Sequence, residues 1–316
     1  MKKCCIFSCK GLGDGLINLV LGYNLFLNDY KVTLYHDNHL DDLQSWFSYI
    51  TILPFPVDGL ASQIYEENDL VFIAYDKSNP FLMALIQDGK TTCPSKTYVL
   101  NPSVTTKIGS QPYYGDTKFN PGIPMVENMV NFCSHILKLN KVTIFNGFSP
   151  PSLLQNRRYI NRLIIHPTSA NENRNWPLDR YVTLATLLQS NGFEPVLVMT
   201  DKEIQQLKND TKALSYVKTF SNLDELASFV FESGYMIGND SGIGHLASML
   251  GLPSITICRN PRVFDLWRPG WQKNIGIYPS KKIPNISGFR IRDQLWKRLI
   301  GPKKVLKRFL DLKTTC

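Results

Sequence analysis

The stretch YMIGNDSGIGHLASMLGLPSITIC, residues 235–258, indicates a strand, a sharp turn, a helix and a second strand in succession. Asp240 or Ser241 is suited to cap the helix, and Gly251 with Pro253 is suited to end it. Glycines in the turn let the backbone approach a ligand, and unpaired amides at the helix start attract an anion such as phosphate. The stretch therefore predicts an α/β fold with an anion site, although an ordinary capped helix has the same pattern.

Length and composition agree with two α/β domains. The chain has 316 residues, of which 43% are hydrophobic, and no apolar run approaches the ~20 residues that span a bilayer. The apolar run after Met1 is too short for a signal peptide. Seven scattered cysteines without a C-x-x-C pair indicate thiols in a reducing compartment and predict no metal site. We expect a cytoplasmic protein.

Positive charge is concentrated in the second half of the chain. Residues 1–155 hold 11 basic and 13 acidic residues, a net charge of −2, whereas residues 156–316 have a net charge of +11. Residues 281–316 alone carry +9, and their apolar residues have helical spacing. This basic tail is either the solvated face of a helix or a contact with an anionic membrane surface. Nucleic acid is not an expected partner.

Two successive series of strands and helices point to two domains with parallel sheets. Pro150 and Pro151 begin a polar linker between them. The predicted domains are residues 1–150 and 158–290, followed by the basic helical tail, 291–316. The predicted strands cover residues 4–8, 31–35, 70–74, 96–100, 162–166, 195–199, 235–238 and 254–258. The predicted helices cover residues 15–27, 125–139, 178–190 and 223–232, with an acidic turn at 201–203.

The first loop, KGLGDGL at residues 10–16, is similar to a dinucleotide-binding fingerprint, but Leu16 stands where that pattern needs a third glycine or alanine. Asp37, after the second strand, partly restores this interpretation as a candidate ribose ligand. Gly11 and Gly13 allow a tight turn. Asp14 lies where the strand meets its helix, so it is a candidate base, with helix N-cap as the alternative.

The loop after the first strand of the second half carries side chains suited to phosphate. Thr168 and Ser169 can donate to a phosphate, and Arg174 can pair with a diphosphate. Arg174 could equally be an ordinary surface arginine. Glu203, after the next strand, is a weaker candidate for binding a ribose.

The helix start within residues 235–258 adds further candidates for the same ligand. Asp240 can accept hydrogen bonds from sugar hydroxyls, and Ser241 offers a hydroxyl donor. The backbone at Gly242 and Gly244 can present amides to an anion. His245, one turn into the helix, suits either packing or ligand binding.

Three segments together resemble glycosyltransferase family 9, typified by the ADP-heptose:lipopolysaccharide heptosyltransferases of Gram-negative bacteria. Residues 11–14 are similar to the family's first loop with its catalytic aspartate, and residues 166–177 to its phosphate loop, although Arg174 stands where lysine is usual. The most diagnostic motif is matched by Asp240, Ser241, Gly242, His245, Leu246, Ala247, Gly251 and Pro253. These segments extend over nearly the whole chain.

The resemblance implies a GT-B architecture, in which two Rossmann-like domains face an interdomain cleft and the tail crosses back to the first domain. It also implies inverting transfer of a sugar, taken to be heptose from ADP-heptose, to a lipid-linked saccharide of the lipopolysaccharide core at the inner face of the inner membrane. Asp14 would be the base. The donor would be bound by Thr168, Ser169, Arg174, Glu203, Asp240, Ser241, Gly242, Gly244 and His245, and no metal or cofactor would be required.

Two alternatives stay open. A non-catalytic GT-B-like protein that binds sugar nucleotide or glycan would share the motifs. An NAD-dependent oxidoreductase would use the first loop and Asp37, but it leaves the phosphate motifs of the second half unexplained.

The charge of the first half departs from the family's pattern. A strongly anionic acceptor would be expected to meet a basic domain, and this half has a net charge of −2. Either the acceptor is less anionic, or positive charge is local, with Lys77, Lys96, Lys107 and Lys118 as candidates.

Overall fold

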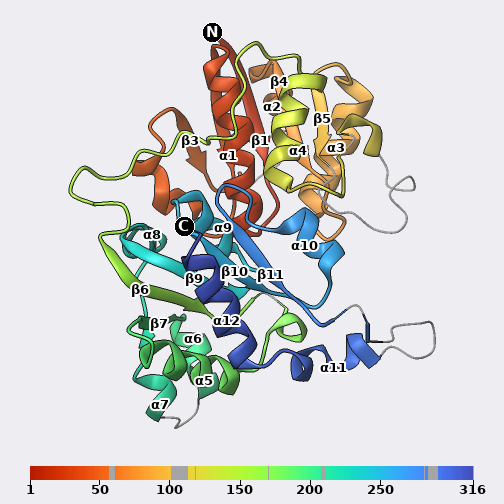
Figure 1. Ribbon diagram of the computed structural model, residues 1–316. Coiled ribbons are helices and arrows are strands. Elements are labelled where there is room, and N and C mark those ends of the chain that lie inside the picture. Colours follow the sequence, from red (N-terminus) through yellow and green to blue (C-terminus); the bar gives the residue numbers. More distant parts are fainter. Residues whose placement is uncertain are drawn as a thin grey trace. The chain divides into compact units, whose positions relative to one another are not determined.

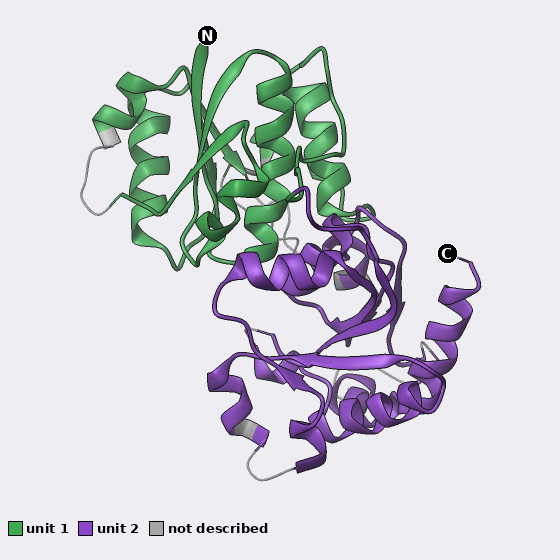
Figure 2. Ribbon diagram, turned by 90° about the vertical axis from the view of Figure 1, so that its left-hand side faces the viewer, with its two compact units in different colours: residues 1–151 green, residues 152–316 purple. Residues whose placement is uncertain are grey.

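The computed structural model divides the chain into two compact units, residues 1–151 and 152–316 (Figure 2). It describes all residues except 57–60, 101–112, 118, 170, 208–210, 281, 284–290 and 316. Each unit contains one parallel sheet with helices packed against it (Figure 1). The predicted α/β class with two parallel-sheet domains is therefore confirmed.

The first unit is built on a five-stranded sheet of order β3-β2-β1-β4-β5, in which every neighbouring pair is parallel. The strands are β1 (Lys2–Phe7), β2 (Tyr30–Tyr35), β3 (Ile50–Leu53), β4 (Leu70–Ala74) and β5 (Thr97–Leu100). The helices are α1 (Leu12–Leu27), α2 (Ala61–Glu67), α3 (Pro80–Thr92) and α4 (Met125–Asn131), with 3-10 turns η1 (Leu40–Trp46) and η3 (Tyr114–Asp116) and a π turn η4 (Phe132–Ile136).

Alternate residues of these strands face opposite helical layers because successive side chains of a strand point to opposite sides. Phe7 of β1 and Val71 of β4 belong to a buried cluster with residues of α2 and α3. Ile6, the neighbour of Phe7, faces α1, where Gly22 lets the helix approach the sheet closely. Helix α1 is buried along most of its length and also contacts α4.

The second unit has a six-stranded parallel sheet of order β11-β10-β9-β6-β7-β8. The strands are β6 (Tyr159–His166), β7 (Glu194–Val198), β8 (Val217–Lys218), β9 (Ser233–Asn239), β10 (Ser254–Ile257) and β11 (Asn274–Ile277). The helices are α5 (Leu178–Gln189), α6 (Asp201–Ile204), α7 (Thr211–Leu214), α8 (Leu223–Phe231), α9 (Gly242–Met249), α10 (Pro261–Trp267), α11 (Ile291–Leu299) and α12 (Pro302–Lys313), with 3-10 turns η5 (Glu172–Arg174) and η6 (Gln205–Leu207).

The C-terminal helix α12 is part of this second unit. Val305, Phe309 and Leu312 are buried in one cluster with residues of α5 and of five strands, β6, β7, β9, β10 and β11. The basic side chains Lys303 and Lys307 lie on the exposed side of the same helix. The predicted domains leave residues 291–316 as a tail after the second domain, whereas α12 packs into the core of the second unit. No helix within the described ranges is long and apolar enough to cross a membrane.

Several other elements differ from the sequence-based expectation. Strands β3, β8 and β11 were not predicted, and the expected acidic turn at 201–203 is the short helix α6. The helix expected at 125–139 ends at Asn131 and continues as a π turn to Ile136.

In both sheets, the strands that follow the first strand are added first on one side of it and later on its other side. In the first unit, β2 and β3 lie on one side of β1, and β4 and β5 lie on the other. In the second unit, β7 and β8 lie on one side of β6, and β9 to β11 on the other. Open α/β sheets bind ligands outside the carboxyl ends of the strands at such reversals. We therefore expect sites at the ends of β1 and β4 and of β6 and β9.

Candidate functional site

The second unit has a cavity of about 220 Å³ at the carboxyl ends of β9 and β10, bordered by the loop after β6. Arg174 comes from the loop after β6, and Asp240 follows β9. The remaining lining residues are Asn171, Asn173, Ile257, Cys258, Arg259 and Asn260. Two of the side chains singled out in the sequence, 66 positions apart, thus border the same cavity at the reversal point of the sheet.

The pKa of Asp240 is displaced from its ordinary value in this cavity. Burial raises the pKa of Asp240 to about 6, and the nearby positive charge of Arg174 opposes this shift. Burial and the charge of Asp240 together raise the pKa of Cys258 to about 12, so that thiol stays protonated. The cavity therefore combines a fixed cation with a carboxyl group that changes its charge near pH 6.

Helix α9 begins at this cavity. Ser241 is its N-cap residue, and the Ser241 carbonyl accepts hydrogen bonds from the amides of Gly244 (3.0 Å) and His245 (3.4 Å). The amides of Gly242 and Ile243 precede these bonds, so helix geometry gives them no acceptor within α9. The first-turn amides suited to an anion are thus those of residues 242 and 243, while the Gly244 amide bonds to Ser241.

A chain of polar side chains connects Ser241 to Glu203. The Ser241 hydroxyl oxygen lies 3.0 Å from Nδ1 of His166, and Nε2 of His166 lies 3.3 Å from Oγ1 of Thr168. Burial lowers the pKa of His166 to about 4, so the ring is neutral and has one N–H. Thr168 donates to Glu203, so its oxygen accepts from Nε2, and Nδ1 accepts the proton of Ser241. The hydroxyl groups of Ser241 and Thr168 therefore both donate their protons to partners within the protein.

Glu203 and Ser169 also have partners within the protein. Oε2 of Glu203 accepts from the Thr200 amide (2.7 Å) and hydroxyl (2.8 Å), which closes a capping box at α6. Burial raises the pKa of Glu203, but hydrogen bonds from Thr168 and Thr200 outweigh it and lower the pKa below its ordinary value. Ser169 donates to Oδ1 of Asn175 at 2.7 Å. Ligand binding by Thr168, Ser169 and Glu203 stays a prediction.

Asn239 is a site residue that the sequence reasoning missed. It is buried at the end of β9, and its Oδ1 accepts from the Trp176 amide and the Tyr181 hydroxyl, each at 3.0 Å. Its amide nitrogen donates to the carbonyl of Pro167. Asn239 therefore fixes both ends of the loop that carries Arg174 to the strand that precedes Asp240. The available signal was a polar side chain directly after the apolar run 235–238.

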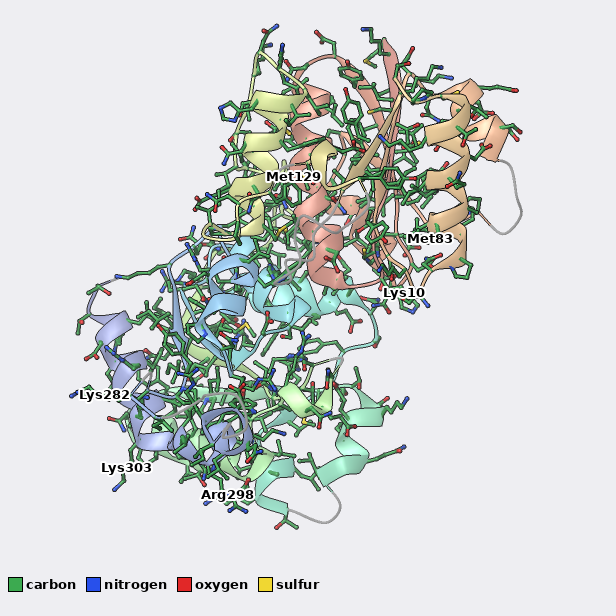
Figure 3. The ribbon with its side chains drawn as sticks, turned by 90° about the vertical axis from the view of Figure 1, so that its right-hand side faces the viewer. Lys10, Met83, Met129, Lys282, Arg298 and Lys303 are labelled. Carbon is green, nitrogen blue, oxygen red and sulfur yellow. The ribbon has the colours of Figure 1, made fainter. Side chains whose placement is uncertain are left out.

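The junction of α11 and α12 supports the same loop. The Ile300 carbonyl accepts from Nε1 of Trp176 (3.0 Å) and from Arg180 (2.6 Å). Nζ of Lys297 donates to the Glu172 carbonyl at 3.3 Å. Figure 3 labels Arg298 and Lys303 on the two sides of this junction. The C-terminal helices thus hold the site loop in place.

His245 is packed inside the unit. Burial lowers the pKa of His245 to about 4, and the ring is hydrogen-bonded to the backbone of Trp267. Its edge also meets the ring of Trp271, with 6.4 Å between the centroids. These contacts favour the packing interpretation over ligand binding.

In the first unit, Asp14 lies in the first turn of α1, and Gly11 is the N-cap residue, so the N-cap alternative for Asp14 is wrong. A β-carbon at residue 11 would overlap Oδ2 of Asp14, so the Asp14 side chain would have to move if residue 11 were larger. Nε2 of buried His36 lies 3.1 Å from the Gly11 carbonyl oxygen and fixes the loop. Gly13 is half-buried in the same turn. Asp37 accepts from the Phe55 amide at 3.2 Å.

A family model described as glycosyltransferase family 9 (heptosyltransferase) matches residues 116–293, more than half of the chain. No curated protein matches the sequence.

Solved structures share the fold at low sequence identity. The E. coli heptosyltransferase WaaC with ADP is 13% identical, with a TM-score of 0.64 over 98% of this chain and 99% of that chain. The E. coli ADP-heptose lps heptosyltransferase II is 14% identical, with a TM-score of 0.66 over 98% of both chains. The family 9 glycosyl transferase from Veillonella parvula is 15% identical, with a TM-score of 0.66 over 100% of this chain and 98% of that chain. These matches confirm the GT-B-like fold.

Proposed function

Because the chain belongs to glycosyltransferase family 9, we propose that it transfers heptose from ADP-heptose to a lipid-linked saccharide of the lipopolysaccharide core. The observation that carries this proposal is the presence of Arg174 and Asp240 around one cavity at the reversal point of the second sheet. The guanidinium of Arg174 suits the donor diphosphate, and the carboxyl group of Asp240 suits sugar hydroxyls. A protein of similar fold, WaaC, holds ADP and ADP-2-deoxy-2-fluoro heptose, which supports this choice of donor.

The reaction is a direct displacement with inversion. The acceptor oxygen attacks the anomeric carbon of the donor, and Asp14 accepts the proton of that hydroxyl. The bond between the anomeric carbon and the diphosphate oxygen breaks, and ADP leaves with both bonding electrons. Arg174 and the amides of Gly242 and Ile243 stabilise the negative charge that develops on the departing diphosphate.

A thermal-shift panel with ADP, UDP, GDP, CMP and NAD tests the donor assignment. ADP is expected to raise the melting temperature most, because a ligand that binds only the folded state stabilises it by mass action. A larger shift with UDP or GDP would contradict ADP-heptose as the donor. A preference for NAD would favour the oxidoreductase alternative instead.

The substitution Asp14→Asn tests the role of the base. Transfer from ADP-heptose should fall by about 10²–10⁴-fold, the usual contribution of general base catalysis, while ADP affinity stays within about twofold. The control Asp41→Asn changes an exposed carboxylate of the same unit and should leave transfer unchanged. Retained turnover in Asp14→Asn would remove this residue from the base role, whereas absence of transfer in the wild-type protein would favour a binding protein.

A further inference from the structure

The first unit has a cavity larger than the one beside Arg174, and the proposed reaction assigns it no role. It has a volume of about 380 Å³, within the range of small-molecule sites. Lys10 follows β1, Asp37 follows β2 and Asp76 follows β4, so the cavity lies at the carboxyl ends of the strands where this sheet reverses (Lys10 is labelled in Figure 3). This is the place where an open α/β sheet binds its ligand.

One wall of this cavity is aromatic and held in place. Phe55 and Phe81 line it, and their ring centroids are 5.6 Å apart. Both rings pack against the fully buried Phe7, with centroids at 5.9 Å and 5.8 Å. Such rings offer a fixed apolar surface, which suits the C–H face of a sugar ring.

Two carboxylates add hydrogen-bond acceptors to the lining of the same cavity. Oδ1 of Asp37 accepts from the Phe55 amide at 3.2 Å. Oδ1 of Asp76 accepts from the amide (2.9 Å) and hydroxyl (2.6 Å) of Ser78. These bonds orient each carboxylate through one oxygen, and the second oxygen keeps its capacity to accept from ligand hydroxyls. With Lys10, the charged residues that line the cavity sum to −1.

Among the described residues of this unit, the cations that could meet a phosphate are lysines, and Lys77 is exposed between the lining residues Asp76 and Ser78. No arginine precedes Arg157 in the sequence, and arginine is the residue best suited to bidentate phosphate binding. Lys96, a candidate for local positive charge, donates to the carbonyls of Tyr65 and Asn68, each at 3.2 Å. Lys107 and Lys118 lie outside the described residues. A phosphorylated sugar would therefore meet two carboxylates in this cavity without a matching arginine.

We propose that the cavity of the first unit binds the acceptor through a sugar that carries neither phosphate nor carboxylate. The aromatic wall packs against the sugar ring, and Asp37 and Asp76 accept from its hydroxyls. This inference rests on the proposed transfer reaction, because that reaction makes the cavity an acceptor subsite.

Saturation-transfer NMR titrations of the full chain, without donor, test this inference. The probes are the methyl glycosides of glucose, galactose and N-acetylglucosamine, compared with glucose 6-phosphate and galactose 6-phosphate. At least one uncharged glycoside should bind at least about fivefold more tightly than either phosphate ester. Absence of binding by every uncharged glycoside, or a preference for a phosphate ester, would overturn the inference.

Three variants test whether the glycoside binds in this cavity. Phe81→Ala should weaken binding of the uncharged glycoside by about threefold or more, the usual effect of losing an aromatic contact. The double variant Asp37→Asn, Asp76→Asn keeps the oxygens that accept from Phe55 and Ser78, and should reduce the discrimination against phosphate. Glu66→Gln removes an exposed carboxylate of the same unit and should change neither property. Unchanged affinity in Phe81→Ala would move the binding elsewhere and contradict the proposal.

The two tests fail independently. Binding of an uncharged glycoside without any preference for ADP would contradict the proposed donor and leave this cavity as a sugar site. ADP preference without glycoside binding would overturn only the acceptor inference.

Discussion

The carboxyl group of Asp240 experiences two opposing effects. Burial raises its pKa to about 6, and the charge of Arg174 limits the shift. A diphosphate bound at Arg174 would offset that attraction, so the pKa should rise further. At a fixed pH near 6, a higher pKa means more of the protonated form, and ADP binding should therefore be accompanied by proton uptake. Calorimetric titration in two buffers of different ionisation enthalpy measures this uptake.

The variant Asp240→Asn is the control for this proton uptake. ADP itself exchanges protons on binding, and that contribution is the same in both proteins. The difference between wild type and Asp240→Asn isolates the carboxyl group, and it should vanish about two pH units above its pKa. Equal uptake in the two proteins would show that Asp240 does not sense the diphosphate.

Asn239 should matter more for stability than its position beside the cavity suggests. Asn239→Ala removes the acceptor for Trp176 and Tyr181 and leaves the Pro167 carbonyl without its donor. We expect a loss of about 2 kcal/mol or more in urea unfolding, because buried polar groups lose their partners. Asn191→Ala, an exposed residue after α5, should cost less than about 0.5 kcal/mol. Similar losses in both variants would contradict the bridging role.

The contrast between Asp240 and Asn239 shows what the sequence can disclose about single residues. Asp240 and Arg174 were identified because a turn and a loop at strand ends favour ligand contact, whatever the details of packing. The partners of Asn239 lie 58, 63 and 72 positions away, so its bridging role depends on tertiary contacts that no local pattern contains. The same reason hides the use of the Ser241 proton by His166.

At the scale of elements, one face of α12 packs into the core of the second unit, and the other face carries exposed basic side chains. Phe309→Ala should destabilise the protein by about 3–5 kcal/mol, because it opens a cavity in the core of the second unit. Lys307→Gln, on the exposed face of the same helix, should change stability by less than about 0.5 kcal/mol. Urea unfolding of both variants measures the difference, and comparable effects would argue against the packing of this helix.

Membrane association through α12 is testable only with variants that keep its packing. Deletion of residues 301–316 would remove Val305, Phe309 and Leu312 from the core, so any loss of binding could come from unfolding. The triple variant Lys303→Gln, Lys307→Gln, Arg308→Gln removes three exposed charges instead. If the tail contacts lipid, binding to vesicles that contain phosphatidylserine should fall at least about tenfold at low salt.

A matched triple variant provides the control for vesicle binding. Lys202→Gln, Lys212→Gln and Lys218→Gln remove the same charge from other exposed positions of the second unit. This variant should bind vesicles more tightly than the α12 variant. Equal losses would show that total charge, and not the face of α12, attracts the membrane.

The predicted elements that agree best have strong local patterns. The apolar run at 70–74 coincides with β4, and all but its first residue is buried. Strand β3 has four residues that alternate between buried and exposed at the edge of its sheet, too short a pattern to distinguish from a loop. Strand β11, at the edge of the other sheet, is only partly buried apart from Ile277. An edge strand pairs on one side only, with a neighbour 18 positions away for β3 and 20 for β11, and this pairing lies beyond the reach of a local sequence pattern.

At the scale of the whole molecule, the two units differ in net charge, and we expect their two proposed substrates to respond differently to salt. The first unit has a net charge of −2 and the second a net charge of +11. ADP affinity should therefore fall as salt rises from about 0.05 to 0.5 M, because the ions screen its attraction to the second unit. Binding of an uncharged glycoside should stay constant over the same range. Isothermal titration for ADP and saturation-transfer NMR for the glycoside measure both trends, and a salt-independent ADP affinity would contradict this division.

The place of α12 in the chain also affects biosynthesis. The ribosome delivers residues 302–313 after every strand of the sheet that they cover. Until this helix emerges, apolar side chains of the second sheet and of α5 lack their cover, whereas all elements of the first unit are already outside the exit tunnel. The newly made second unit should therefore be the part that recruits chaperones, and translation pauses near the codons of α12 should lower the yield of active protein.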